Sequence, residues 1–138
     1  MRHVLIIFLL VLLTVGVVAQ TKVQVVPAPY TPSDSGKAMY DAYCASCHGI
    51  DGKGNGPAAS AMKSPVPDLT MLARSHGGQY PAFSVAEVLR VSRPLAAHGS
   101  DDMPVWGPVF SQVSRQDQAL IQQRIRNLNM HIESLQQK

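Results

Sequence analysis

One pentapeptide constrains this chain more than any other feature: Cys44, two small residues, Cys47 and His48 follow one another directly. The pattern C-x-x-C-H is the attachment signature of a c-type haem. The two thiols can form thioether bonds to the porphyrin, and the adjacent imidazole can bind the iron as an axial ligand. These are the only two cysteines among 138 residues, so no disulfide framework is available. The motif predicts one covalent haem c.

A C-x-x-C pair can also belong to a zinc site or to a redox dithiol. A closed zinc site normally has four ligands, and the chain has no second cysteine pair. A thioredoxin-like dithiol lies in an alternating strand and helix pattern. The residues around Cys44 and Cys47 are instead helical on one side and glycine-rich on the other. Haem is therefore the favoured interpretation.

The first 19 residues predict export. Arg2 and His3 precede a largely apolar run of sixteen residues, from Val4 to Ala19. A short basic start, an apolar stretch and a small-residue exit are typical of a secretory signal peptide. Spanning a bilayer takes about 20 apolar residues, so cleavage after Ala19 is favoured over an uncleaved membrane anchor. Either way, the domain is expected in the periplasm or another extracytoplasmic compartment, with membrane attachment through the N-terminus as the alternative outcome.

Residues 20–33 predict a linker, and residues 34–138 predict a single domain. Pro27, Pro29 and Pro32 fall within six positions, which disfavours a helix and favours an extended chain.

The formal charge of +3 implies no strongly basic face, which argues against nucleic acid as a partner. Aromatic residues make up only 6% of the chain, so a buried porphyrin would complete a thin core.

Helix and loop signals flank the C-x-x-C-H motif. Residues 36–43 predict a helix that begins at one of three possible N-caps, 33–35, and runs into the motif. Four glycines among residues 49–56 then predict an irregular loop around the haem edge. An iron-bound histidine normally donates its other ring nitrogen to a carbonyl or carboxylate. Pro57, or a residue beside it, is the expected source of that carbonyl.

The sequence predicts four further helical segments, over residues 58–62, 69–74, 84–91 and 115 to about 136. Ser84 and Glu87 form a capping pattern at the start of the third segment. Ser111 or Ser114 is expected to open the last helix. Its apolar residues recur at three- and four-residue steps and predict one inward-facing stripe, which consists of Leu120, Ile121, Ile125, Leu128, Ile132 and Leu135. This stripe continues past Asn129, either as a contact for a partner or as a long helix over the domain.

Three segments together resemble a single-haem class I cytochrome c: CASCHGIDGKGNGPAA at 44–59, PDLT at 67–70 and MPVWG at 103–107. The likeness covers about residues 36–129 and is closest to small bacterial cytochromes, similar to the haem subunits of some terminal oxidases and dehydrogenases. It implies an all-α cytochrome c fold, a small helical bundle enclosing one haem with His48 and Met103 on opposite faces. It also implies that the first half of the last helix crosses the helix over 36–43.

The assignment of Met103 as an axial ligand also has support that does not depend on the resemblance. It is the only methionine followed by proline, in a predicted loop 55 residues after His48. Proline fixes its own φ and pushes the preceding residue into an extended conformation, which would direct the thioether out of a stiff loop. His98 is a rival ligand that would give a bis-histidine haem, and Met103 could instead fill the core. Trp106 is expected to pack beside the haem near Met103.

The resemblance implies an exported carrier that passes single electrons between redox partner proteins. A haem with both axial positions occupied has no open site for a substrate, so an enzyme is not expected. Two alternatives remain: a haem subunit of a larger membrane or periplasmic oxidoreductase complex, and a haem enzyme or gas sensor in which Met103 dissociates. Partners would dock near Cys47, the glycine loop and the Met103 loop. With only five lysines, steering by charge should be weak.

Overall fold

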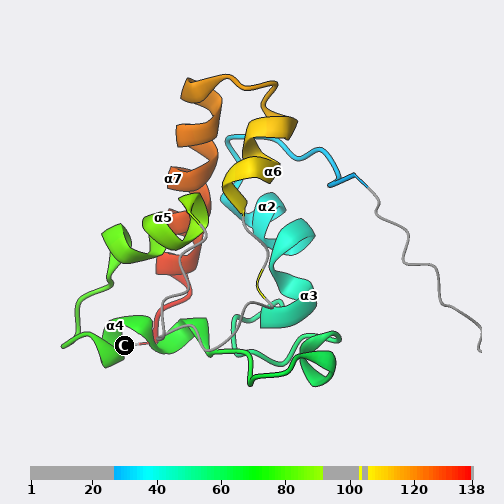
Figure 1. Cartoon of the computed structure of the whole chain (residues 1–138). Coiled ribbons are helices and arrows are strands. Elements are labelled where there is room, and N and C mark those ends of the chain that lie inside the picture. Colours follow the sequence, from blue (N-terminus) through cyan, green and yellow to red (C-terminus); the bar gives the residue numbers. More distant parts are fainter. Residues whose placement is uncertain (1–26, 92–102, 104–105, 138) are drawn as a thin grey trace, which may run out of the picture.

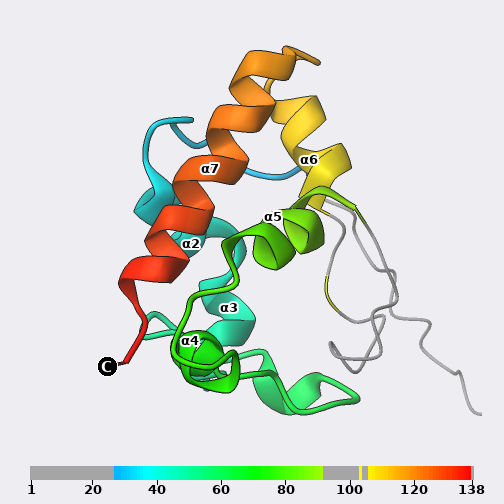
Figure 2. The ribbon, with the colours of Figure 1, turned by 90° about the vertical axis from the view of Figure 1, so that its left-hand side faces the viewer.

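The computed structural model describes residues 27–91, 103 and 106–137. These residues form helices and loops, with no strand among them. In chain order the helices are α2 (Gly36–Tyr43), α3 (Ala45–His48), η1 (Ala59–Ala61), η2 (Leu69–Met71), α4 (Leu72–Ser75), α5 (Ala82–Arg90), α6 (Trp106–Val113) and α7 (Gln118–Ser134). Figures 1 and 2 show α7 lying against α2, with α5 and α6 beside them and α3 and α4 below. The all-α expectation is confirmed.

Helices α2 and α7 cross at a glycine. A Cβ atom built on Gly36 would lie 2.0 Å from the carbonyl oxygen of Asn127 and 3.0 Å from Cβ of His131. Only a residue without a side chain allows the two backbones to approach this closely. The helices therefore cross in the second half of α7, and not in its first half as expected, because the one glycine of α2 faces Asn127.

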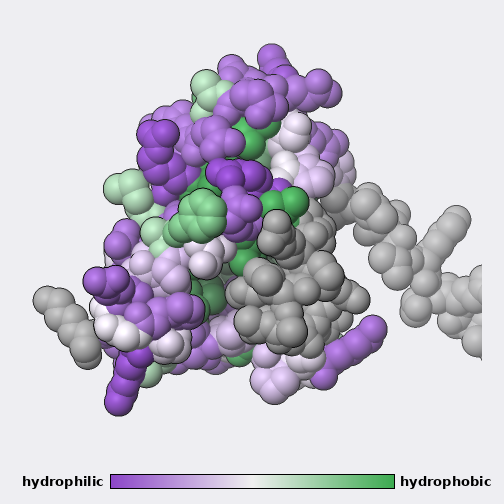
Figure 3. Space-filling view, turned by 60° about the vertical axis from the view of Figure 1, so that its left-hand side comes forward, coloured by the Kyte–Doolittle hydropathy of each residue, from purple (hydrophilic) through white to green (hydrophobic). Residues whose placement is uncertain are grey.

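The core lies between α2 and the apolar stripe of α7. Met39, Tyr40 and Leu128 are fully buried. The predicted stripe is confirmed at four positions, which are Ile121, Ile125, Leu128 and Ile132. Leu120 was also expected to face inward, but it is 37% exposed because it lies one position before the stripe. Figure 3 shows hydrophobic side chains at the centre of one face, flanked by hydrophilic residues.

The start of α5 differs from the prediction. The helix begins at Ala82, two residues early, and Ser84 is an exposed residue inside it. Pro81 stands at the cap, and its carbonyl accepts the N–H of Val85 at 3.0 Å. Proline suits a helix start because the first N–H groups have no intrahelical partner. The residue that marks the start of α5 in the sequence is therefore Pro81 and not Ser84.

The start of α7 also differs from the prediction. Arg115 and Gln116 have positive φ angles of 51° and 64°, so neither can belong to a right-handed helix. Asp117 is the cap, and its Oδ1 accepts the N–H groups of Ala119 and Leu120 at 2.9 and 3.2 Å. The prediction of an N-cap at Ser111 or Ser114 was wrong, because Arg115 and Gln116 form a left-handed turn before the helix begins.

Helix α6 was not predicted. Its first three residues are Trp106, Gly107 and Pro108, and glycine beside proline is typical of a loop. Proline is tolerated in the first turn because the N–H groups there have no intrahelical partner. Gly107 permits close contact with α5, since a Cβ at this position would lie 2.1 Å from the carbonyl oxygen of Arg90. The short helical segments predicted at 58–62 and 69–74 are confirmed as η1 and as η2 followed by α4.

The end of the predicted linker is bound to the domain. Arg124, only 1% exposed, donates from Nε to Ser114 Oγ at 3.0 Å, from one terminal nitrogen to Thr31 Oγ1 at 3.0 Å and from the other to the Thr31 carbonyl at 2.7 Å. The Tyr43 hydroxyl donates to the carbonyl of Pro29 at 2.6 Å. The chain thus reaches α2 along a defined path from residue 29 onward.

The predicted leader, 1–19, lies outside the described residues. Within the described part of the chain, no helix combines the length and the apolar character needed to cross a bilayer.

Candidate haem site

A single turn of helix carries the C-x-x-C-H motif. Helix α2 ends at Tyr43, and the N–H of Cys44 closes it with a 2.8 Å bond to the Tyr40 carbonyl. The carbonyl of Cys44 then accepts the N–H of His48 at 2.9 Å. Cys44 is buried and Cys47 is half-buried, and both thiols are free. One helical turn therefore presents two thiols and an imidazole side by side.

The environment of Cys44 bears on the dithiol and zinc alternatives. Burial, followed by the charge of Cys47, raises the pKa of the Cys44 thiol to about 12. This thiol stays protonated at neutral pH, whereas thiol exchange and metal binding both use the thiolate. Residues 27–91, 103 and 106–137 contain no group of three or more His, Cys, Asp or Glu side chains placed to hold a metal ion. The buried, protonated thiol of Cys44 suits an apolar environment.

His48 faces a backbone carbonyl. Its Nδ1 lies 3.2 Å from the carbonyl oxygen of Pro67, and its side chain is buried. Because a carbonyl oxygen only accepts, Nδ1 carries the proton in this contact and Nε2 is the nitrogen with the lone pair. A metal-bound histidine uses this arrangement, which fixes the orientation of the ring and raises its basicity.

The carbonyl in this contact comes from Pro67 and not from Pro57, the expected source. Pro57 closes the glycine loop and is exposed. The loop folds back so that the N–H of Leu69 reaches the carbonyl of Gly52 at 2.7 Å, which brings the PDLT segment next to the motif. That segment was recognised only as part of the family resemblance. Its first residue, Pro67, was the sequence feature that could have indicated which carbonyl accepts the hydrogen bond from His48.

The glycine loop is packed tightly against its surroundings. A Cβ on Gly56 would lie 2.4 Å from the carbonyl oxygen of Ser46 on α3, and a Cβ on Gly54 would lie 2.3 Å from that of Val66. Gly54 also has a φ of +76°, which only glycine adopts at low cost. The N–H of Gly54 donates to the His48 carbonyl at 2.8 Å. The loop therefore holds α3 and the Pro67 segment close together.

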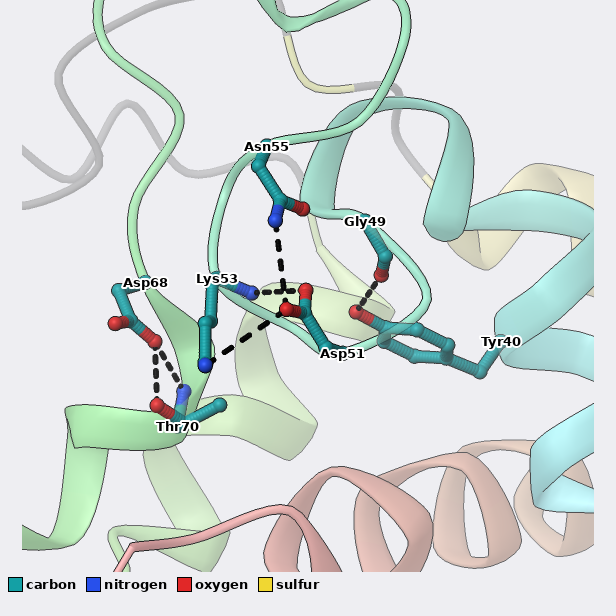
Figure 4. A network of polar contacts seen from close by, with 7 residues as sticks. All are labelled: Tyr40, Gly49, Asp51, Lys53, Asn55, Asp68 and Thr70. Carbon is teal, nitrogen blue, oxygen red and sulfur yellow. Dashed lines mark hydrogen bonds and ion pairs between the residues drawn. The ribbon is translucent and has the colours of Figure 1, made fainter.

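Polar contacts order the same loop, as Figure 4 shows. The buried hydroxyl of Tyr40 donates to the carbonyl of Gly49 at 2.8 Å, which ties the loop to α2. Asp51 accepts the backbone N–H of Lys53 at 3.2 Å and the side-chain amide of Asn55 at 3.4 Å. These contacts hold the backbone after His48 in a single path, as an axial ligand with a fixed orientation requires.

Trp106 lies against the residues that lead into the motif. Its ring centroid is 5.4 Å from that of Tyr43, which immediately precedes Cys44, and 6.2 Å from that of Phe110. Its Nε1 is buried without a hydrogen-bond acceptor among the described residues. An unsatisfied buried N–H is costly, and a carboxylate of a haem propionate would satisfy it. The donors and apolar surfaces at this site therefore fit a haem.

Met103 and the other methionines differ in their surroundings. Met103 is half-buried and packs against the core cluster that contains Tyr43 and Trp106. Met39 is fully buried inside that cluster, and Met130 is 58% exposed on α7. Met62 and Met71 are also partly buried, and Met103 is the one that lies three residues before Trp106.

The histidines other than His48 differ in the contacts they make. His98, the rival ligand, lies outside the described residues. His76 is exposed at the end of α4, with Nδ1 2.8 Å from the Leu72 carbonyl oxygen. The ring of His131 packs at 5.1 Å from that of Tyr40. His76 and His131 therefore have local structural contacts.

Comparisons with known proteins place the chain in a family. Residues 31–122, which are 92 of the 138, match the family described as cytochrome c oxidase, cbb3-type, subunit III. Searches of curated proteins and of solved structures found no match. The matched range begins at Thr31, which Arg124 binds, and includes the C-x-x-C-H turn, the glycine loop, the PDLT segment and Trp106. The chain therefore belongs to this family of single-haem cytochrome c domains.

Proposed function

We propose that this protein is an exported electron carrier that holds one haem c. In this proposal Cys44 and Cys47 bind the porphyrin covalently, and Nε2 of His48 and the thioether of Met103 are the axial ligands. The main support is the contact between His48 Nδ1 and the Pro67 carbonyl, directly after two free thiols on one helical turn. This arrangement orients the imidazole and leaves Nε2 as the nitrogen that would bind iron.

Each residue of the site has a separate task. A bound haem supplies reversible one-electron chemistry. His48 contributes a strong donor whose basicity the Pro67 carbonyl increases, and Met103 contributes a soft thioether that favours the reduced iron. Trp106 offers an N–H to a propionate. The glycine loop covers the side of His48 and limits access of water, which favours electron transfer over ligand exchange.

The surface near the motif suits a partner of low charge. Ile50 follows the motif in the glycine loop and is 83% exposed, and the neighbouring Cys47 is half-buried. The charges next to Ile50, on Asp51 and Lys53, lie 3.9 Å apart and offset each other, so this edge carries little net charge to steer a partner. We expect transient docking of redox partners at this edge, with modest dependence on salt.

Absorbance spectroscopy of the exported protein tests the ligands. The Met103→Ala variant should lose the thioether-to-iron charge-transfer band of the ferric form and have a lower reduction potential, because the soft ligand is gone. Met130→Ala is the matched control, since this exposed methionine lies on α7, outside the motif and its loops. An unchanged charge-transfer band in the Met103 variant would rule out its ligation. Haem that survives acid extraction in a Cys44→Ser, Cys47→Ser double variant would contradict covalent attachment.

A second candidate function is favoured by the family match, which is to an oxidase subunit. The chain would then be a haem subunit of a membrane oxidoreductase complex. Isolation of the native protein under mild detergent conditions separates the two. A carrier should elute at the size of the domain alone, whereas a subunit should co-elute with oxidase activity. N-terminal sequencing of the same sample should begin at Gln20 if the leader is cleaved.

Carbon monoxide distinguishes these proposals from a haem enzyme or gas sensor. Met103 packs against the core cluster, so its thioether should resist displacement. The reduced protein should show no change in its Soret band when carbon monoxide is added at neutral pH. Rapid and complete carbon monoxide binding would favour a sensor or an enzyme with an open iron.

A further inference from the structure

The chain after α7 turns back and binds the segment that contains Pro67. The side-chain oxygen of Gln136 accepts the N–H of Ala73 at 2.8 Å, and its side-chain nitrogen donates to the Leu69 carbonyl at 2.7 Å and to the Ile132 carbonyl at 2.9 Å. The backbone N–H of Gln137 donates to the Thr70 carbonyl at 2.9 Å. Figures 1 and 2 show the C-terminus beside α4. The tail therefore holds η2 and α4 at several points.

Gln136 completes the junction between η2 and α4. Leu69 and Ala73 are four residues apart, the spacing at which a carbonyl and an N–H bond each other in an uninterrupted α-helix. Here the amide of Gln136 bonds to both groups, at the point where a 3-10 turn gives way to an α-helix. Only an amide supplies an acceptor and a donor side by side at this reach. Glutamine is therefore suited to position 136 because its amide provides both the acceptor and the donor.

This junction begins two residues after Pro67. Asp68 caps the junction, since its Oδ1 accepts the N–H of Thr70 at 2.8 Å and the hydroxyl of Thr70 at 2.6 Å. On the other side, the N–H of Leu69 donates to the Gly52 carbonyl. The tail supports this contact too, because a Cβ built on Gly52 would lie 3.2 Å from Cδ1 of Leu135. The place of the Pro67 carbonyl is thus set by the glycine loop and by the tail together.

We propose that Gln136 is a positioning residue for the haem ligand, acting through the Leu69–Ala73 junction to hold the Pro67 carbonyl against Nδ1 of His48. The role rests on the proposed ligation of iron by His48. A carbonyl held close makes the imidazole a stronger donor, which stabilises the ferric iron. Release of the junction lets the carbonyl recede, weakens that donation and favours the ferrous iron. The part of α7 that extends beyond Asn129 carries the tail to this junction.

The test compares haem-loaded variants at adjacent positions. Gln136→Ala removes three hydrogen bonds, whereas Gln137→Ala removes an exposed side chain and keeps the backbone bond to Thr70. We expect Gln136→Ala to shift the ferric–ferrous equilibrium about three- to tenfold toward the ferrous form, which is about 30–60 mV at 59 mV per tenfold change. Exchange of the His48 Nδ1 proton, followed by NMR, should accelerate in parallel. Gln137→Ala should match the wild type in both measurements.

Gln136→Glu covers the case in which the alanine variant does not accumulate. The carboxylate keeps the acceptor for Ala73 and loses the donor to Leu69, so a smaller shift in the same direction is expected. A wild-type potential and wild-type His48 proton exchange in the folded Gln136 variant would overturn the positioning role. The exchange of the Nδ1 proton reports on the Pro67 contact, and the wild type and the Gln136 variants can be compared whatever the axial ligands are. It therefore still decides the role of Gln136 if the wild-type spectrum contradicts ligation by His48 and Met103.

Discussion

Replacement of Gly36 by alanine tests the close crossing of α2 and α7. Helix propensity alone predicts that this change stabilises the protein, by up to about 1 kcal/mol. The geometry predicts the opposite sign. The added Cβ would lie 2.0 Å from the Asn127 carbonyl oxygen, whereas ordinary contacts begin near 3.4 Å. One helix must therefore move by more than an ångström relative to the other.

The size of the effect follows from what that movement disturbs. The crossing lies beside Tyr40 and Leu128, which are fully buried, and beside the ring contact between Tyr40 and His131. Overpacking of this kind costs about 1–3 kcal/mol. A shift of Gly36 also strains the adjacent cap, in which Ser35 Oγ accepts the N–H of Ala38 at 3.1 Å, worth about 1 kcal/mol. We expect a loss of about 2–4 kcal/mol.

The assay is thermal and denaturant unfolding of the haem-loaded protein, followed by circular dichroism. A loss in this range corresponds to a decrease in Tm of roughly 10–20 °C for a domain of this size. Ala42→Gly is the matched control, because Ala42 is exposed on the same helix and reports propensity alone, at about 1 kcal/mol or less. A Gly36→Ala protein as stable as the wild type, or more stable, would refute the close crossing.

Three further predictions follow from buried polar groups. Arg124→Ala should lower the free energy of unfolding by about 3 kcal/mol, because the acceptors of its three hydrogen bonds lose their donor. Replacement of the exposed Arg126 by alanine is the control and should change the free energy of unfolding by less than about 0.5 kcal/mol. Equal denaturation midpoints for the two variants would contradict the prediction. Burial, opposed by Asp41 and assisted by Lys37, lowers the pKa of His131 below its usual value. The unfolded chain therefore binds the proton more readily, so stability should fall as pH decreases from about 7 through the lowered folded-state pKa. That part of the pH dependence should disappear in His131→Gln and persist in His76→Gln. Trp106→Phe keeps an aromatic side chain and removes the N–H. A propionate without this donor keeps more of its negative charge and stabilises the ferric iron, so the reduction potential should decrease by the equivalent of about 1 kcal/mol. Potentiometric titration checks this, and an unchanged potential would contradict a hydrogen bond to a propionate.

Features encoded within a few residues were predictable from the sequence. The helix over 36–43 was found with its boundaries because a capping serine precedes it and the C-x-x-C-H motif follows. The short turn predicted over 58–62 was found at 59–61, one residue shorter at each end. The resemblance carried by the C-x-x-C-H, PDLT and MPVWG segments predicted the cytochrome c class, which the family match confirms. Local signals sufficed for the helix and the turn because caps and turns depend on neighbouring residues alone.

Boundaries that depend on a competing signal were predicted less well. Helix α6 was missed because Gly107 and Pro108 resemble a loop, although proline is acceptable in a first turn. The terminal helix was started too early because Ser111 and Ser114 are good caps in isolation. The left-handed turn before Asp117 overrides both, and no residue in that turn is a glycine that would have indicated it.

The sequence by itself determined which groups are available for chemistry, namely two thiols, an imidazole and a methionine before proline, and through the family resemblance it indicated an all-α domain. Only the tertiary structure decided which backbone groups support that chemistry. Pro67 and not Pro57 faces His48, α2 meets α7 at Asn127, and Gln136 reaches a junction 63 residues away in sequence at Ala73. The reason is physical: residue types and short spacings set reactivity and local geometry, whereas a carbonyl becomes a hydrogen-bond partner only through the path that the whole chain takes around its core.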